Sequence, residues 1–150
     1  MSNVLGHVGA WAPRPEQVAT AKLLDRMDVI REYHQKERAG MQERLELLHG
    51  GLTALKREGF AVDSLQPMGA IYLTARFALA GKRTKNGTVL RTNEEIRRYL
   101  LNAAGCAIVP FQAFGAQDDS GWFRMSIGAV SPDEIQAMFP RVRAALAALS

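Results

Sequence analysis

The sequence predicts an α+β domain: a small mixed sheet of about four strands with helices packed on it, led by a long helix. Three observations predict this class. Apolar residues in the first half repeat at steps of three and four, which places them on one face of a helix. After Gly59 the repeat changes to the alternation of strands with one buried face. Two later segments carry the capping-box residues that begin helices.

The size and composition of the chain are those of a globular protein. Its 150 residues are 47% hydrophobic and 23% charged, so a core can form without disulfides or metals. The apolar runs are far shorter than a membrane span, and the opening residues lack the basic and apolar regions of a secretory signal. We therefore expect a cytoplasmic protein with no membrane partner.

The formal charge of +4 raises the question of a nucleic-acid partner. Most of the 19 Lys and Arg residues alternate with acids, which is typical of a solvated helix face. The one basic concentration, residues 82–85, is followed by Asn86-Gly87 and is interpreted as an exposed turn, with phosphate binding the less favoured alternative. We expect no nucleic-acid partner.

An irregular segment precedes the first helix. Residues 1–14 contain Gly, Pro and Trp without a helical or strand period, so we separate them from a domain over residues 15–150. Pro15 suits the first position of a short helix that ends near Asp25.

A long helix is expected over residues 28–56. Gly50 and Gly51 weaken it locally, because glycine inside a helix costs about 1 kcal/mol relative to alanine. Apolar residues form a stripe along one face of this helix, which predicts that the helix lies against a sheet or another helix. Its apolar members are Met41, Leu45, Leu48, Leu52 and Leu55.

Four segments are predicted as strands. Residues 70–77 and 122–127 alternate apolar with polar side chains, so each is expected to bury one face. Residues 60–62 are predicted to form a short strand. Residues 106–109 are apolar throughout, as in a strand buried on both faces, until Pro110 stops them.

The later helices are predicted from their ends. Thr92 and Glu95 form a capping box, and Gly105 supplies the left-handed residue that ends the helix. The segment SPDE at residues 131–134 forms a second capping box with proline at the first helical position. Pro140 is expected to kink or break this last helix.

Three motifs stand in order in the second half of the chain: PMGAIY at residues 67–72, GCAIVPFQAFG at 105–115 and GWFRMSI at 121–127. In this order and spacing they resemble the small domain of class I/II aminotransferases of fold type I, the pyridoxal-phosphate enzymes similar to aspartate aminotransferase. That family carries P-x-G-A-[FI]-Y, G-V-x-V-x-P-G-x-x-F-G and G-x-x-R-[LIM]-[SC] before a last helix. The resemblance covers about residues 2–150.

The resemblance implies that Arg124 binds substrate, because the arginine of the third motif pairs with the substrate α-carboxylate in that family. A guanidinium forks onto a carboxylate through two hydrogen bonds and so fixes orientation as well as charge. Strand alternation places Arg124 opposite the core-facing Phe123 and Met125. The alternative is an ordinary strand arginine that reaches solvent or a neighbouring acid.

The resemblance also implies candidate site residues in the opening segment. In the family an irregular stretch ahead of the small-domain helices borders the active site, often that of the partner subunit. Asn3 and Arg14 are therefore candidate substrate-binding residues. Phe111-Gln112 stands where the family usually has Gly followed by a small residue, so this loop departs from the family pattern.

The family's chemistry needs residues that this sequence lacks. In that family a lysine in a Ser-x-x-Lys or Ser-Lys context, upstream of the whole region that this sequence resembles, binds the cofactor and moves a proton. We therefore expect pyridoxal phosphate only in the intact parent, and no catalytic, cofactor-binding or metal-binding residue in this chain. None of the lysines has the required context: Lys22, Lys36, Lys56, Lys82 and Lys85.

Other reactive side chains favour structural interpretations. Cys106 is the only cysteine, which excludes an internal disulfide, and its apolar setting favours a small buried hydrophobe over a nucleophile. The three histidines lack metal-ligand spacing. Asp118 and Asp119 lie in a polar loop and are expected to be solvated.

These patterns predict the C-terminal part of an aminotransferase that transfers an amino group from an amino acid to a 2-oxo acid. This part would contribute the carboxylate-binding arginine and would be inactive without the missing large domain. The intact parent is expected to be a homodimer. The alternative is a non-catalytic α+β module that binds a ligand, a protein or RNA.

Overall fold

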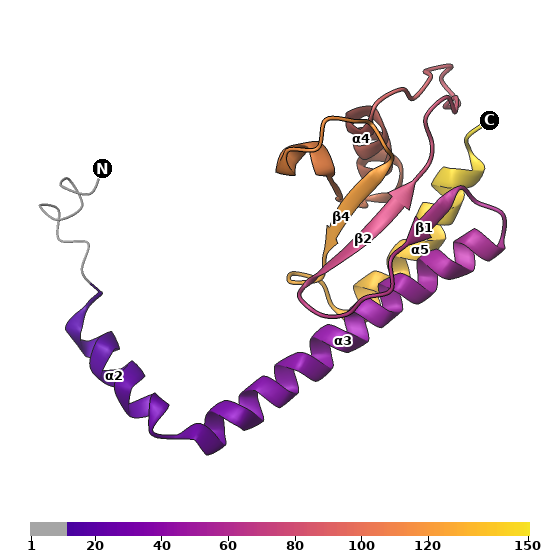
Figure 1. The fold of residues 1–150 in the computed structure, drawn as a ribbon. Helices are drawn as coiled ribbons and strands as arrows, with labels where there is room; N and C mark the ends of the chain where they lie inside the picture. The colour runs from indigo at the N-terminus through magenta and orange to yellow at the C-terminus, as the bar shows by residue number, and fades with distance from the viewer. Residues whose placement is uncertain (1–11) are drawn as a thin grey trace, which may run out of the picture. The chain divides into compact units, whose positions relative to one another are not determined.

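The computed structural model describes residues 12–150, so Asn3 and most of the predicted opening segment lie outside the described residues. The chain divides into two compact units, Met1–Ala39 and Gly40–Ser150. Each unit is described by itself, and Figure 1 shows the course of the chain.

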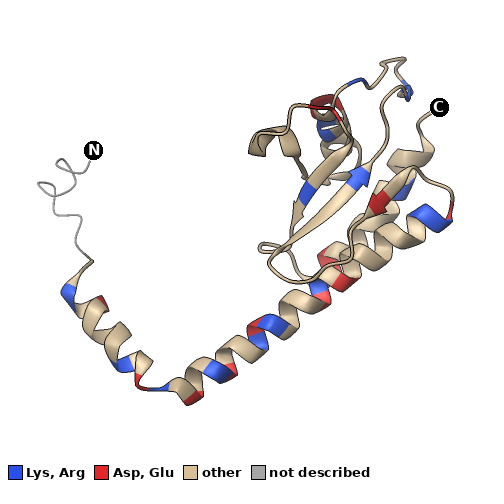
Figure 2. Cartoon of the chain, in the orientation of Figure 1, with Lys and Arg blue, Asp and Glu red and all other residues tan. Residues whose placement is uncertain are grey.

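The described part of the first unit is helical. Helix α2 (Arg14–Leu24) follows Pro13 and buries none of its residues. Helix α3 (Met27–Arg57) begins in this unit and continues into the second. Acidic and basic residues alternate along α3, as the charge pattern predicted (Figure 2). Apolar side chains are also exposed on this unit: Val18, Leu23, Leu24, Met27, Val29 and Tyr33.

The second unit is a four-stranded sheet with helices packed on it. The α+β class and the long leading helix are confirmed. After the C-terminal part of α3 the elements are β1 (Val62–Ser64), β2 (Tyr72–Phe77), α4 (Asn93–Ala104), β3 (Val109–Pro110), the 3-10 helix η1 (Phe111–Phe114), β4 (Trp122–Ser126) and α5 (Pro132–Ala147).

The strand order is β1-β2-β4-β3, and every neighbouring pair is antiparallel. The fold class is as predicted, but the expectation of a mixed sheet is wrong, for a topological reason. The crossover through α4 does make β2 and β3 run in the same direction. However, β4 lies between them and is antiparallel to both, so no two neighbouring strands of this sheet are parallel.

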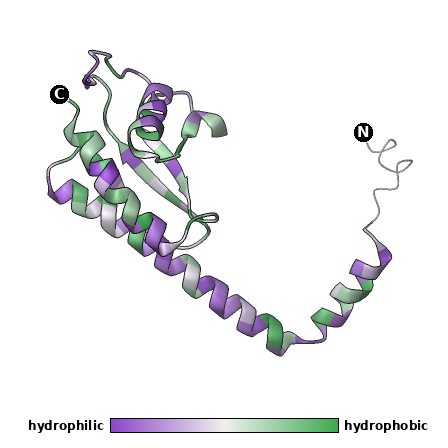
Figure 3. Cartoon of the chain, turned by 180° about the vertical axis from the view of Figure 1, so that it is seen from behind, coloured by the Kyte–Doolittle hydropathy of each residue, from purple (hydrophilic) through white to green (hydrophobic). Residues whose placement is uncertain are grey.

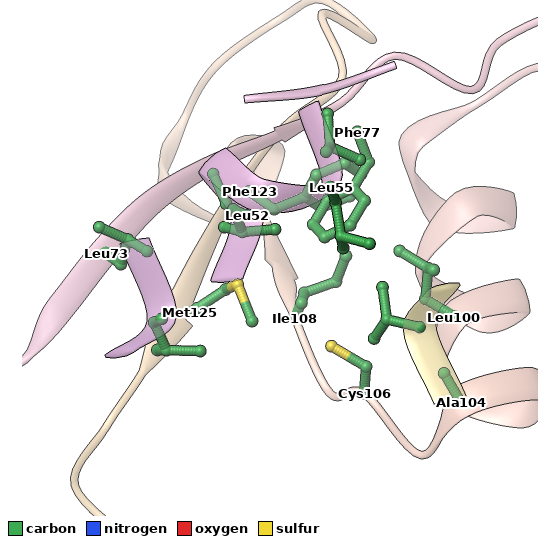
Figure 4. Packing of buried hydrophobic residues seen from close by; sticks show 14 of the residues in the cluster. Leu52, Leu55, Leu73, Phe77, Leu100, Ala104, Cys106, Ile108, Phe123 and Met125 are labelled. Carbon is green, nitrogen blue, oxygen red and sulfur yellow. The ribbon is translucent and has the colours of Figure 1, made fainter. Parts of the chain in front are cut away.

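One face of the sheet carries the core. Leu73 and Phe77 of β2 and Phe123 and Met125 of β4 are buried, and they pack with apolar residues of α3 and α4 (Figure 4). Buried residues of α5 belong to the same core cluster. The rings of Phe77 and Phe123 meet edge to face with centroids 6.0 Å apart. Each fully buried side chain of this size contributes about 1.5–3 kcal/mol. Apolar residues also concentrate along α5, whereas hydrophilic residues cover much of α3 (Figure 3).

Both predicted capping boxes are present. The Glu95 N–H donates to Thr92 Oγ1 at 3.2 Å, and the Glu95 carboxylate accepts from the Thr92 N–H at 3.0 Å. Ser131 and Glu134 make the same exchange at 3.2 and 2.7 Å. Gly105 ends α4 in the left-handed conformation, with φ 63°. Both ends of α4 and the start of α5 therefore follow from local sequence.

Two strands differ from their predicted positions. The first lies at Val62–Ser64 rather than at residues 60–62. The strand predicted over residues 106–109 comprises only Val109–Pro110. The Cys106 N–H instead donates to the carbonyl of Leu100 in α4, at 3.2 Å. Capping of the helix thus replaces strand pairing at the start of this segment.

Pro140 lies inside α5, and the helix continues to Ala147 without the predicted break. A proline removes one helical hydrogen bond and strains the preceding turn. Beyond it, however, Val142, Ala145 and Leu146 are buried in the core. Tertiary packing therefore overrides the local preference of the sequence.

Gly51 is required by the packing of α3 against α5. A Cβ at residue 51 would overlap the ring of Phe139, whereas a Cβ at residue 50 would meet nothing within 4 Å. Gly50 and Gly51 both lower the helix propensity of α3, but of the two only Gly51 is needed for the packing of α3 against α5.

Alanine substitutions separate the two glycines. Gly51→Ala is expected to lower the free energy of unfolding by about 1–3 kcal/mol, the range for overpacked cores, because the Phe139 ring has to move. Gly50→Ala is expected to raise it by up to about 1 kcal/mol through helix propensity. Urea unfolding of both variants measures the difference, and equal effects would contradict the packing role of Gly51.

Candidate functional site

The face of the sheet opposite the core is open. It carries polar, aromatic and basic side chains because β2 and β4 alternate between the two faces. In the register of the sheet, Thr74 lies opposite Arg124 and Arg76 lies opposite Trp122. Basic residues mark both strands, and neither strand has an acidic residue (Figure 2).

Arg124 is packed against two aromatic rings on this open face. Its Cζ lies 4.1 Å from the ring centroid of Tyr72 and 4.0 Å from that of Phe114. Tyr72 comes from β2, the neighbouring strand, and Phe114 is the last residue of η1. Both contacts are of the cation–π type, which holds a guanidinium over the negative face of a ring. We call Arg124, Tyr72 and Phe114 the arginine cluster.

The N–H groups of Arg124 are available for a ligand in the described part of the chain. Its guanidinium makes no ion pair within residues 12–150, whereas Arg143 is held by Glu58 at 2.6 Å and Arg97 by Glu94 at 2.7 Å. The described residues therefore do not show the alternative of a strand arginine paired with a neighbouring acid, whereas the alternative of one that reaches solvent is not tested by the absence of an ion pair. A half-buried, oriented guanidinium suits a planar anion with two oxygens, such as a carboxylate.

The described structure does not test the other two candidate residues. Asn3 lies outside the described residues. Arg14 is the exposed first residue of α2, in the first unit. The roles suggested for both remain predictions.

Tyr72 and Phe114 are members of the arginine cluster that sequence reasoning missed. Each lies in one of the three motifs, and Tyr72 stands on the polar side of a predicted strand alternation. That alternation was a usable signal for Tyr72. Phe114 had no such signal, because its place depends on the turn of η1, which ends at Gly115 with φ 94°.

Cys106 is a buried residue of the core, 2% exposed. Burial raises the pKa of its thiol to about 11, and the positive charge of Arg141 opposes this only in part. The thiolate that a nucleophile needs is therefore disfavoured. This agrees with the prediction of a small buried hydrophobe.

The lysines of this chain do not fit a pyridoxal phosphate site. A lysine that binds this cofactor needs a shielded setting, where its amine can lose a proton. All five lysines are exposed, and Lys56 donates to Asp63 at 2.6 Å. None of the three in the second unit belongs to the arginine cluster.

Other kinds of site were sought among residues 12–150. These residues contain no group of three His, Cys, Asp or Glu side chains that could hold a metal ion. None of the described helices is both long and apolar enough to cross a membrane.

The fold and sequence match those of known transferases. Residues 5–142 match the family model for class I and II aminotransferases. The chain is 30% identical to the aspartate aminotransferase of Rhizobium meliloti over 137 residues, which is 91% of this chain and 32% of that protein. It is 35% identical to a probable aspartate/prephenate aminotransferase of Rickettsia conorii over 92 residues, which is 61% of this chain and 22% of that protein.

Solved structures of aminotransferases also match this fold. The crystal structure of the aspartate aminotransferase from Rhizobium meliloti matches with a TM-score of 0.67 and 32% identity, covering 79% of this chain and 28% of that one. An aromatic aminotransferase from Pyrococcus horikoshii shares the fold, with a TM-score of 0.61 and 22% identity over 77% of this chain and 27% of that one.

The fold is thus that of part of an α+β transferase. The chain belongs to the class I and II aminotransferase family. It spans between a fifth and a third of the length of these curated relatives.

The buried state of Cys106 predicts slow reaction with thiol reagents. At pH 8 the folded chain is expected to react with Ellman's reagent at least about 100-fold more slowly than the chain in urea, since a pKa near 11 leaves little thiolate. Absorbance at the thionitrobenzoate band measures both rates. Similar rates in the two states would contradict the assignment of Cys106 to the core.

Proposed function

We propose that this chain is the C-terminal part of a pyridoxal-phosphate aminotransferase and that Arg124 binds the α-carboxylate of the amino-acid substrate. The arginine cluster is the observation that supports this most directly. The cluster holds a guanidinium on an open sheet face without an acidic partner among residues 12–150. Arg124 also occupies the arginine position of the third motif.

The geometry supports a positioning role for Arg124. Two N–H groups of one guanidinium can donate to the two carboxylate oxygens, so the Cα of the substrate is held at a fixed orientation. The rings of Tyr72 and Phe114 limit the rotamers of the long side chain and exclude water from part of its surface. Such orientation lowers the entropic cost of the reaction that follows.

We propose that the cofactor is held outside this chain. Pyridoxal phosphate, when bound to the intact enzyme, supplies an electron sink for the bond changes at the substrate Cα. Because the lysines here do not fit its site, we propose that a large domain provides the lysine and the phosphate-binding groups. The proposed parent is a homodimer, with residues 1–14 bordering the active site and residues 15–150 forming the small domain.

The substrates are proposed from the relatives. Two of them are named as aspartate or aspartate/prephenate aminotransferases, so an amino acid and a 2-oxo acid are the proposed substrate pair. L-Aspartate is accordingly a suitable probe for the carboxylate site.

Nuclear magnetic resonance of the Arg124 side chain tests the carboxylate site. The Nε–H resonance of Arg124 is expected to shift on titration with sodium L-aspartate, in the millimolar range for the isolated chain. Arg124→Lys is expected to weaken binding by about 10-fold or more, because an ammonium cannot form the bidentate pair.

Arg76→Lys is the matched control for this test. Arg76 lies on the same open face, with its Cζ 5.9 Å from the Trp122 ring centroid, and we give it no contact with substrate. This variant is expected to bind L-aspartate like the unchanged chain. If Arg124→Lys bound L-aspartate as tightly as Arg76→Lys does, positive charge alone would account for binding and the assignment of Arg124 would be refuted.

A titration with pyridoxal phosphate tests the placement of the cofactor. The purified chain is expected to show only weak, unsaturable absorbance changes from its exposed lysines. The intact enzyme is expected to show one saturable site that responds to amino acids. A single saturable site in the purified chain, discharged by an amino acid, would show that one of the five lysines binds the cofactor.

A further inference from the structure

The loop before β4 is anchored to the N-terminus of α4 by a buried asparagine. Asn93 is only 1% exposed, and its backbone N–H, Nδ2 and Oδ1 each make a hydrogen bond. Its N–H donates to Asp119 Oδ1 at 2.6 Å, its Nδ2 donates to Gln112 Oε1 at 3.0 Å, and its Oδ1 accepts from the Gly121 N–H at 3.0 Å. Asn93 of α4 is therefore hydrogen-bonded both to η1 and to Gly121, the residue that immediately precedes β4.

Gln112 completes this network from the side of η1. Its Nε2 donates to the carbonyl of Asp118 at 2.6 Å and to Asp119 Oδ1 at 2.9 Å, while its Oε1 accepts from Asn93. The side chain therefore ties η1 both to α4 and to the far end of its own loop. A small residue, as the family usually has here, could not make these bonds.

The ring of Phe114 depends on the position of η1. It is 48% exposed, so burial in the core does not fix it. Its aromatic and cationic contacts are with Phe111, at a centroid separation of 6.1 Å, and with Arg124. Phe111 belongs to η1 as well, so the placement of the Phe114 ring over Arg124 follows the backbone that Gln112 holds.

We infer that Gln112 is a positioning residue for the carboxylate site: by tying η1 to Asn93 and to the loop end, it holds the Phe114 ring against the guanidinium of Arg124. The inference rests on the proposed function of Arg124. It assigns a role to the departure of this sequence from the family pattern, because a long amide replaces the usual small residue and acts through Phe114 on the substrate-binding arginine.

Side-chain resonances of Arg124 in the full chain test this role. Protons beside an aromatic ring are shifted by its ring current, so Phe114→Leu defines the change that follows loss of the ring. Gln112→Ala is expected to reproduce most of that change. Gln117→Ala, an exposed glutamine in the same loop that makes no hydrogen bond within residues 12–150, is the matched control and is expected to leave Arg124 unaffected.

The outcomes separate positioning from general stability. If Gln112→Ala lowers the unfolding temperature but leaves the Arg124 resonances as they are in the unchanged chain, Gln112 is only a structural residue and the inference is overturned. An effect of Gln117→Ala equal to that of Gln112→Ala would overturn it too. If Gln112→Ala does not fold, Gln112→Met takes its place: methionine keeps the length of the side chain but cannot make the three amide hydrogen bonds, so the same loss of ring-current shift is expected.

Titration of the same variants with sodium L-aspartate extends the test to binding. Gln112→Ala is expected to weaken binding several-fold, and Gln117→Ala to leave it unchanged. Unchanged affinity in Gln112→Ala would limit the role of Gln112 to loop structure and would contradict the inference. If the unchanged chain does not respond to L-aspartate, the proposed function of Arg124 fails, while the ring-current comparison still decides whether Gln112 places Phe114.

Discussion

The burial of only one face of the sheet is the constraint on which the rest of the structure depends. Strands β2 and β4 place alternate side chains in the core, and the buried leucines of α3 pack on that side. Because the period is two, the remaining side chains necessarily gather on the opposite face. Arg124 reaches that face only because Phe123 and Met125 are buried. A shift of register by one residue would bury the guanidinium.

The arginine cluster joins three parts of the chain that are distant in sequence. Tyr72 comes from β2, Arg124 from β4 and Phe114 from η1. The position of β4 between β2 and β3 brings them together, since Arg124 lies beside both neighbouring strands. The hydrogen bonds of Asn93 then fix the loop relative to α4. The site is therefore a product of the antiparallel topology and of one buried polar network.

Local sequence predicts the elements of this fold better than their arrangement. Thr92, Glu95 and Gly105 determine the ends of α4 through backbone hydrogen bonds, so those ends could be predicted. The motifs likewise singled out Arg124 as a candidate, and its role in substrate binding stays a prediction. The antiparallel sheet and the unbroken helix at Pro140 depend on contacts with distant residues. Phe114 was missed for the same reason, because its neighbour Arg124 is close only after folding.

The contact between Gly51 and Phe139 has a consequence for sequence divergence. At this point the space between α3 and α5 holds the Phe139 ring and leaves no room for a side chain at residue 51. The volumes of residues 51 and 139 are therefore linked: a relative with a larger side chain at the first position has room for only a smaller one at the second. Two such changes made together would restore packing that neither allows alone, so these positions should vary as a pair.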